Sequence, residues 1–259
     1  MNEAVKTVLA LADLTTEEAK KIWLQVRGGV VAIGSLEQHG PNLGMSVDTA
    51  IADALARRLA QRLAPRVVLL PAIPYGVSYH HMAFTGSLTL RAETLDAIVS
   101  DLVSSLAHHD VRCLIVVNGH GGNTAPLATT FGRLRFEGFR IAALSWFGLA
   151  GDEAARIARS PSYGHACEVE TSIALALSPH LVRKNGLAQG RLKALPFRHS
   201  EIRGPARAEA SYRFEELTEN GALGDARLAT LEDGERIVGT TLERAVALAE
   251  DFLENVHDV

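Results

Sequence analysis

Short apolar runs alternate with longer amphipathic segments along the first two thirds of the chain, and this alternation limits the fold more than any other feature. The run Cys113-Leu114-Ile115-Val116-Val117 has no polar residue at every second position, which is typical of strands buried on both faces of a parallel sheet. Strands that alternate with helices build such sheets. The sequence predicts an α/β fold, a three-layer α/β/α sandwich with a mostly parallel central sheet. The predicted strands cover residues 30–33, 67–70, 113–117 and 140–144.

The segments between these runs have the pattern of helices. Thr15-Thr16-Glu17-Glu18 forms a capping box that predicts a helix towards Val26, because Thr15 can cap and Glu18 can reach back. Further helices are predicted over residues 48–63, 91–108, 124–137 and 242–256. Residues 178–233 hold many Gly, Arg and Pro residues without a clear period, so we expect loops and short strands covering the sheet within one domain, residues 1–259.

Composition narrows the partners of the chain. The 26 basic and 30 acidic residues give a net charge of −4, whereas nucleic-acid binding leaves a basic footprint. No stretch reaches the roughly 18 continuous apolar residues of a membrane span, and the N-terminus lacks the features of a secretory signal. We therefore expect a cytoplasmic protein that acts on a small molecule and binds neither nucleic acid nor membrane. Its two cysteines, Cys113 and Cys167, make no disulfide framework.

Three polar segments carry the candidate chemistry, and two of them directly follow predicted strands. In open α/β sheets, ligands bind outside the carboxyl ends of the strands. Glu37 and His39 follow strand 30–33 and are two residues apart, so an extended backbone points both the same way. A carboxylate and an imidazole together suit zinc, manganese or iron(II). Asp48, at the start of the next helix, can cap that helix or bridge two metal ions.

The other two segments add imidazoles and carboxylates. His120 lies between glycines that leave its ring unobstructed, which favours a ligand over a loop histidine bonded to backbone. His165, Glu168 and Glu170 stand just ahead of an apolar run. Acidic residues at a helix start also complement its dipole, but that accounts for one glutamate and not for the histidine beside them.

Taken together, the spaced motifs resemble the creatininase (creatinine amidohydrolase) family. The motifs are Gly34-Ser35-x-Glu37-Gln38-His39-Gly40-Pro41, Asn118-Gly119-His120-Gly121-Gly122-Asn123 and His165-Ala166-x-Glu168-x-Glu170-Thr171-Ser172, and Tyr75-Gly76-Val77-Ser78 with His81, Phe84 and Gly86 is similar to a further signature. The resemblance implies a creatininase-like fold and a centre of two divalent ions per chain, zinc, manganese or iron.

The resemblance also implies a ligand set. Glu37, Asp48 and His120 would hold one ion. His39 and the shared Asp48 would hold the other, together with one more carboxylate. Creatininase takes that carboxylate two residues after the histidine of the Asn-Gly-His motif, where this chain has Gly122.

Family members with glycine at that position carry a glutamate three residues after the later histidine. Glu168 stands at that spacing from His165, so we expect Glu168 to be the fifth ligand.

Two divalent ions lower the pKa of a bridging water and polarise a carbonyl, so we expect the bridging hydroxide to attack an amide carbon. His165 is the expected proton shuttle to the leaving nitrogen, since the reference pKa of histidine is about 6.5. Glu170 would orient His165 or a ligand. Ser78, His81 and the backbone of Gly121 are candidates for substrate binding.

The leading hypothesis is a binuclear metal-dependent amidohydrolase that cleaves a non-peptide C–N bond, in a cyclic amide or a formamide. The alternatives are a hydrolase of a cyclic diketone or lactone such as an oxidised inositol, and a peptidase of cofactor maturation. A non-catalytic sugar- or nucleotide-binding domain is a third hypothesis. Creatininase places a tryptophan–aspartate pair over its substrate, where this chain has Ser162-Tyr163-Gly164.

The resemblance further implies a homo-oligomer, a hexamer built from dimers. We expect residues 178–233 to form an interface, with Leu192, Leu195 and Phe197 as its apolar side chains.

Overall fold

A four-stranded parallel sheet lies at the centre of the computed structural model, which describes residues 7–194 and 211–254. The strands are β1 (Gly28–Ile33), β2 (Val67–Leu69), β3 (Cys113–Asn118) and β4 (Arg140–Leu144), in the order β2-β1-β3-β4. Every neighbouring pair is parallel, with Val31 opposite Val116 in the central pair. The predicted α/β fold with a mostly parallel sheet is confirmed.

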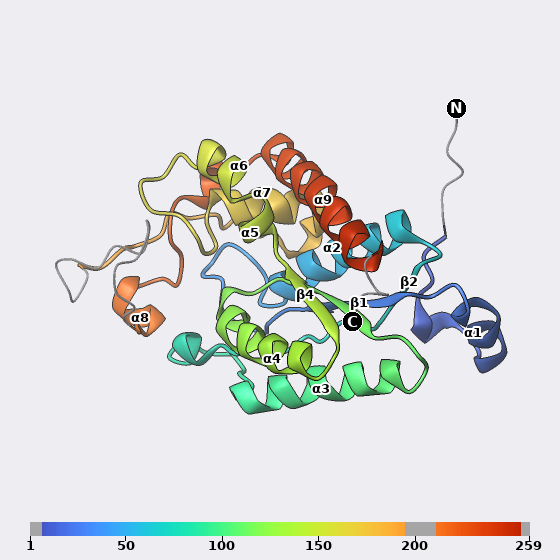
Figure 1. Ribbon diagram of the computed structural model, residues 1–259. Helices are drawn as coiled ribbons and strands as arrows, with labels where there is room; N and C mark the ends of the chain where they lie inside the picture. The colour runs from blue at the N-terminus through green and yellow to red at the C-terminus, as the bar shows by residue number, and fades with distance from the viewer. Residues whose placement is uncertain (1–6, 195–210, 255–259) are drawn as a thin grey trace.

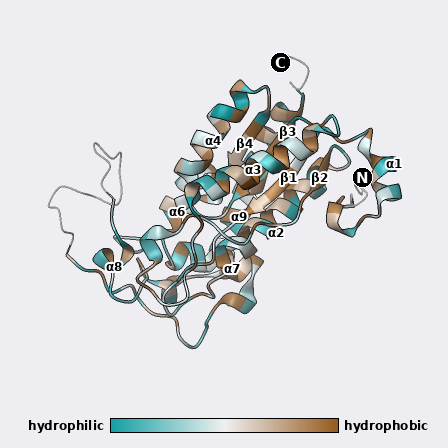
Figure 2. Cartoon of the chain, turned by 90° about the horizontal axis from the view of Figure 1, so that it is seen from below, coloured by the Kyte–Doolittle hydropathy of each residue, from teal (hydrophilic) through white to brown (hydrophobic). Residues whose placement is uncertain are grey.

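Helices cover both faces of the sheet (Figure 1). One face carries α2 (Val47–Leu63), α5 (Trp146–Leu149), α6 (Gly151–Ile157), α7 (Glu168–Leu177) and α9 (Leu231–Glu254); the other carries α3 (Ala92–Ala107) and α4 (Thr124–Phe136). Successive strand residues enter different cores, Val30 with the first group and Val31 with the second. Burial on both faces explains the unbroken apolar runs, which are coloured brown in Figure 2.

The last helix begins earlier than predicted, at Leu231 and not at residue 242. A Cβ on Gly234 would overlap the carbonyl oxygen of Ser172, so this glycine lets α9 pack closely on α7. Glycine in a helix is less favourable than alanine by about 1 kcal/mol, so the sequence did not predict these first turns as helical. Packing against α7 outweighs that preference. Between α7 and α9 the described residues form short turns and the four-residue helix α8 (Phe214–Leu217), and residues 231–233, expected in the loop-rich region, belong to α9.

The strand order creates a topological switch point between β1 and β3. The chain leaves β1 through α2 on one face and leaves β3 through α4 on the other (Figure 1). The loops therefore separate at the carboxyl ends of these two strands, where open α/β sheets form their binding crevices. Gly34 and Gly119 begin these two loops.

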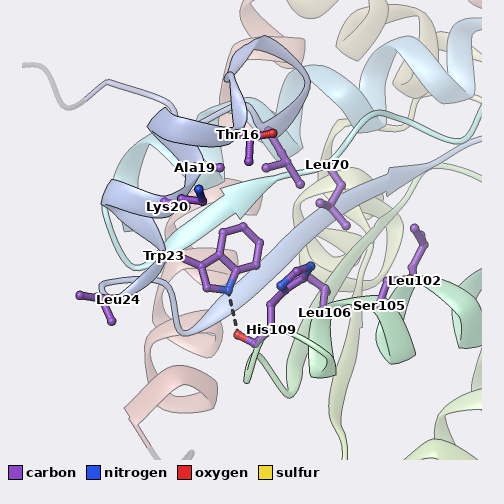
Figure 3. A pocket seen from close by; sticks show the side chains of 11 residues that line it. Thr16, Ala19, Lys20, Trp23, Leu24, Leu70, Leu102, Ser105, Leu106 and His109 are labelled. Atoms are coloured by element: carbon purple, nitrogen blue, oxygen red, sulfur yellow. Dashed lines mark hydrogen bonds between the residues drawn. The ribbon is translucent and has the colours of Figure 1, made fainter.

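A second hollow lies away from this edge, between α3 and the N-terminal helix α1 (Thr16–Trp23). The capping box predicted at Thr15 and Glu18 is present. The Trp23 indole N–H donates to the carbonyl of His109 at 2.8 Å and ties α1 to the end of α3 (Figure 3). The groove, of about 660 Å³, is mostly apolar. Among the described residues, no helix combines the length and the apolarity that crossing a membrane would require.

The packing of α2 in the hydrophobic core that it shares with α7 and α9 gives a test of the fold. Leu59 on α2 is 1% exposed, and Leu248 on α9 is 48% exposed. We expect Leu59→Ala to lower the free energy of unfolding by about 2–5 kcal/mol, because it leaves a cavity. Leu248→Ala is the control, with an expected change within about 0.5 kcal/mol. Urea unfolding measures both, and equal losses would contradict this packing.

Candidate active site

Acidic and imidazole side chains from both switch-point loops meet in one buried cluster. Glu37 and His39 come from the loop after β1, His120 follows β3, and Asp48 lies in the first turn of α2. Each of the four is less than 5% exposed. Ser46 stands at the N-cap of α2 and the structure shows no side-chain cap, so Asp48 is directed to the cluster and not to the helix end.

Asp48 lies between two histidines and turns one oxygen to each. Its Oδ1 is 3.2 Å from His39 Nε2, and its Oδ2 is 3.3 Å from His120 Nδ1. His120 Nδ1 is also 3.2 Å from Glu37 Oε2. A carboxylate so placed can serve two cation sites at once.

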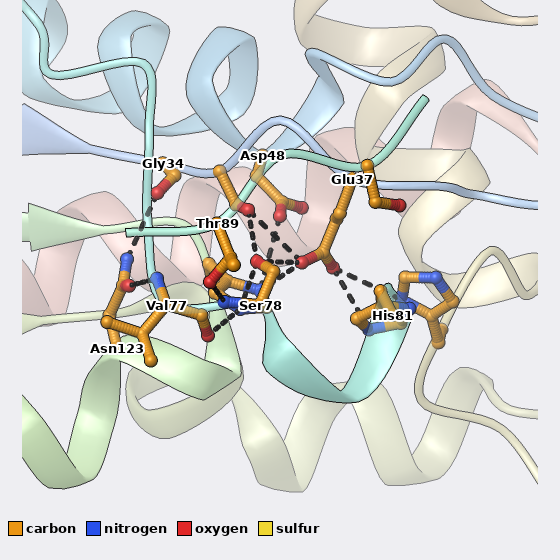
Figure 4. A network of polar contacts seen from close by, with 12 residues as sticks. Gly34, Glu37, Asp48, Val77, Ser78, His81, Thr89 and Asn123 are labelled. Atoms are coloured by element: carbon orange, nitrogen blue, oxygen red, sulfur yellow. Dashed lines mark hydrogen bonds and ion pairs between the residues drawn. The ribbon is translucent and has the colours of Figure 1, made fainter. Parts of the chain in front are cut away.

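Glu37 is anchored by hydroxyl groups (Figure 4). Its Oε2 accepts hydrogen bonds from Ser78 Oγ at 2.6 Å and Ser35 Oγ at 3.1 Å, while its Oε1 lies 3.4 Å from His81 Nε2. Ser78, expected to bind substrate, is completely buried beside Glu37 and holds that carboxylate in place. His81 does face the cluster.

The two glutamates of the third motif have different surroundings. Glu168 is fully buried, and its carboxylate accepts hydrogen bonds from the backbone N–H groups of Arg159, Ser160 and Asp225 and from the Ser160 hydroxyl. Glu170 Oε2 lies 3.6 Å from His39 Nε2. The structure thus places Glu168 outside the cluster, against expectation, and Glu170 inside it. Glu168 is the first residue of α7, and its side chain points to the segments that contain Arg159, Ser160 and Asp225.

The position of Gly122 is too crowded for a residue with a carboxylate side chain. A Cβ there would overlap the Val77 carbonyl oxygen and the His120 ring, and would approach His80 Cε1 to 2.9 Å. The carboxylate nearest to His39 Nε2 from the third motif is that of Glu170 on α7, and it can take the place that Gly122 leaves without a carboxylate.

Two histidine rings turn one nitrogen to a backbone carbonyl and the other nitrogen to the cluster. His39 Nδ1 lies 3.2 Å from the Glu37 carbonyl oxygen, and His120 Nε2 lies 3.1 Å from the Val77 carbonyl oxygen. In the neutral rings, a hydrogen on the nitrogen that faces each carbonyl leaves His39 Nε2 and His120 Nδ1 to bind a metal ion, the arrangement common for metal-binding histidines. His39 Nε2 and Asp48 Oδ2 are buried and make no hydrogen bond within the described residues. These residues fit a divalent cation.

The buried charges shift one another's pKa values. Burial works against the charged form of His120, but Glu37 and Asp48 outweigh it and raise the pKa of His120 to about 10. For Asp48, burial is likewise outweighed, because His39 and His120 hold the pKa of its carboxyl well below its usual range. These carboxylates thus favour the protonated forms of His39 and His120 when no cation is bound, and a cation that enters would release the protons.

Two asparagines fasten the loops that carry these side chains. Asn123 donates to the carbonyl of Gly34 at 3.1 Å and accepts from Val77 N–H at 2.9 Å. Asn42 donates to the carbonyl of Ala166 at 2.8 Å and so joins the Glu37 loop to the third motif. These hydrogen bonds hold the loops together without using any side chain of the cluster.

A cavity of about 420 Å³ opens beside the cluster, and Asp48, His120 and Glu170 form part of its wall. Trp146, Phe147 and Tyr163 add aromatic surface, and Gly121 also lines it. Apart from its two chain neighbours, none of the described residues has an atom within 4 Å of where a Cβ on Gly121 would lie, which leaves its backbone open to a ligand. Cys167 lines the cavity too, but burial raises the pKa of its thiol to about 11, which argues against a thiolate nucleophile.

Two further residues of the site, Phe214 and Gln38, are not predicted from the sequence. Phe214, on α8, packs its ring 4.3 Å from His81 and 4.7 Å from His165, between ring centroids. The Gln38 amide nitrogen lies within hydrogen-bond distance of both histidines. Nothing in the sequence signals the contact of Phe214, since α8 follows a long stretch without pattern. Gln38 lies inside the first motif, yet no spacing rule assigns it a partner.

The chain belongs to the creatininase family: the family model, described as creatinine amidohydrolase, matches residues 12–249. It is 33% identical over 244 residues to a mycofactocin precursor peptide peptidase of Mycobacterium ulcerans, covering 92% of this chain and 89% of that protein. It is 28% identical to creatinine amidohydrolase of Pseudomonas putida, covering 86% and 89%. For 3-dehydro-scyllo-inosose hydrolase of Thermotoga maritima, the identity is 26% and the coverage 87% and 77%. The protein is a creatininase-family hydrolase.

Solved structures agree with this assignment. A manganese creatininase matches with a TM-score of 0.76 and 25% identity, over 95% of this chain and 99% of that chain. A mutant creatininase of Zn-Zn type gives the same values. The expected creatininase-like fold is confirmed.

The close approach of Gly119 to α2 gives a test of the cluster. A Cβ on Gly119 would overlap the Asp48 carbonyl oxygen, so we expect Gly119→Ala to displace Asp48, to lower stability by about 1–3 kcal/mol and to reduce the zinc bound per chain. Gly121→Ala is the matched control, because its Cβ would meet nothing within 4 Å. Thermal unfolding and elemental analysis measure both effects. Similar behaviour of the two variants would contradict the argument.

Proposed function

We propose that the protein is a binuclear metal-dependent amide hydrolase. Glu37, Asp48 and His120 hold one divalent ion, and His39, Asp48 and Glu170 hold the second. The observation that carries the proposal is the position of Asp48, which has one oxygen 3.2 Å from His39 Nε2 and the other 3.3 Å from His120 Nδ1. Glu170 replaces Glu168 as the fifth ligand, because Glu170 lies 3.6 Å from His39 Nε2.

Zinc, manganese and iron(II) all suit this set of nitrogen and oxygen ligands. Creatininases solved with manganese and in a Zn-Zn form support the first two. Hydrogen bonds that orient the proposed ligands also support the proposal. Backbone carbonyl groups orient His39 and His120, and the Ser78 hydroxyl orients Glu37.

Metal content tests the ligand set. We expect two ions per chain in the wild type, fewer than two in Glu170→Gln, and two in Glu168→Gln, because only Glu170 faces the cluster. We expect Glu168→Gln to lower the melting temperature, since its amide cannot accept the four hydrogen bonds that Glu168 receives. Elemental analysis of folded protein measures the ions. Loss of metal from Glu168→Gln but not from Glu170→Gln would reverse the assignment.

When bound, two such ions supply an activated water and polarise a carbonyl oxygen. The chain's own residues orient the substrate and move the proton. His165 is our candidate for passing a proton to the leaving nitrogen, because its ring lies 4.3 Å from that of His39, between centroids, and its Nδ1 lies 3.9 Å from Glu37 Oε1. Glu170 thus acts as a ligand and no longer as the residue that orients His165.

The cavity supports a substrate larger than a single small ring. Its aromatic side chains, Trp146, Phe147 and Tyr163, suit an apolar group attached to the scissile amide. A volume of about 420 Å³ accommodates a short peptide segment. The higher identity to the peptide peptidase than to creatinine amidohydrolase favours a peptide amide over the cyclic amide or formamide of the first hypothesis.

Turnover separates these substrates. We expect the metal-loaded enzyme to cleave an amide bond of a mycofactocin precursor peptide and to leave creatinine and 3-dehydro-scyllo-inosose intact, as followed by mass spectrometry. His165→Ala should lower turnover about 10²–10⁴-fold with its metal content unchanged, because it removes the proton transfer. Consumption of creatinine alone would restore the cyclic amide, and consumption of the inosose alone would refute amide hydrolysis. Loss of metal from His165→Ala would make His165 a ligand.

We also propose a homo-oligomer in the cytoplasm, as the family resemblance implies. Leu192, one of the three side chains expected at the interface, is 49% exposed in the single chain, which supports an apolar surface that a second copy could cover. Leu195 and Phe197 lie outside the described residues.

A further inference from the structure

The side-chain amide of Gln38 has only one orientation that satisfies its neighbours. Its Oε1 lies 2.8 Å from the backbone N–H of Gly40, and its Nε2 lies 3.0 Å from the carbonyl oxygen of Gly221. A flipped amide would set N–H against N–H at Gly40 and oxygen against oxygen at Gly221. Both contacts are to main-chain groups whose donor and acceptor roles cannot change. The position of the Gln38 amide protons is therefore determined.

His165 takes its proton arrangement from the backbone of the same residue. Its Nε2 lies 2.8 Å from the Gln38 carbonyl oxygen, which can only accept, so this nitrogen carries a hydrogen. The Gln38 amide nitrogen, 3.1 Å from the same atom, consequently cannot donate to it. In the neutral ring His165 Nδ1 is then bare, and it lies on the side of Glu37 Oε1.

His81 takes the opposite arrangement from the side chain of Gln38. One proton of the Gln38 amide is used by Gly221, and the other is directed to His81 Nδ1 at 2.9 Å. His81 Nδ1 is therefore the acceptor, and the hydrogen of the neutral ring lies on Nε2. That N–H faces Glu37 Oε1 at 3.4 Å.

We propose that Gln38 is a positioning residue that sets two neighbouring histidines in opposite proton states, His81 as an N–H donor and His165 as a bare acceptor towards the cluster. Glu37, His81 and His165 have ligand atoms within 4.8 Å of one another and resemble a metal site. Because His81 Nε2 carries a hydrogen, this triplet does not hold an ion. The inference deepens the proposed function, since it directs the His81 N–H to Glu37 and leaves His165 Nδ1 free to take up the proton that His165 would pass to the leaving nitrogen.

Nitrogen NMR of histidine-labelled protein tests this proposal. We expect the wild type to show His81 with a bare Nδ1 and a protonated Nε2, and His165 with a protonated Nε2. Gln38→Glu exchanges the donating NH₂ for an accepting oxygen, so the signal of His81 Nδ1 should move to the range of a protonated nitrogen. His165 should keep its Nε2 proton, since the backbone carbonyl remains. Spectra of His81→Phe and His165→Phe assign the signals.

Gln25→Glu is the matched control, because it adds the same charge at an exposed residue and should leave both rings unchanged. A bare Nδ1 on His81 in both wild type and Gln38→Glu would overturn the proposal, as would a protonated Nδ1 in the wild type. The wild-type spectrum decides by itself if Gln38→Glu does not fold. No substrate or turnover is needed, so a failure here is distinct from a failure of the proposed function.

Discussion

The mutual compensation of buried carboxylates and imidazoles is the interaction on which the rest of this site depends. Glu37, Asp48 and Glu170 are almost completely removed from water, which is costly for any carboxylate that lacks a partner. His39 and His120 supply that partner by carrying protons, and two cations would do so more strongly. The same balance that permits burial therefore also creates the affinity for metal.

The sheet topology brings the loops of the cluster together, and groups outside the cluster hold these loops in place. Asn123 joins the ends of β1 and β3, and Gly119 lets α2 approach β3 closely enough to deliver Asp48. A shift of either contact would separate ligands that lie far apart along the chain. The cluster therefore forms where the carboxyl ends of β1 and β3 meet the first turns of α2 and α7.

Much of the fold follows from the sequence, since the unbroken apolar runs identify strands buried on both faces and predict their parallel arrangement. The start of α9 does not, because Gly234 has low helix propensity and its value lies in contact with α7. In the site, four of the proposed ligands could be named from spacing and resemblance. The choice between Glu168 and Glu170 could not, because both lie in the first turn of one helix and only the neighbouring loops distinguish them.

The sequence by itself determined the class of fold, the family and the residue types at the cluster, because these depend on local pattern and on short motifs. Only the tertiary structure decided that Glu170 and not Glu168 faces the cluster and that Ser78 holds Glu37. It alone also placed the side chain of Gln38 against His81 and the backbone carbonyl of Gln38 against His165. The physical reason is direction: a hydrogen bond or a ligand bond depends on where a lone pair points, and that direction is set by distant segments such as those of Gly221 and Asp225.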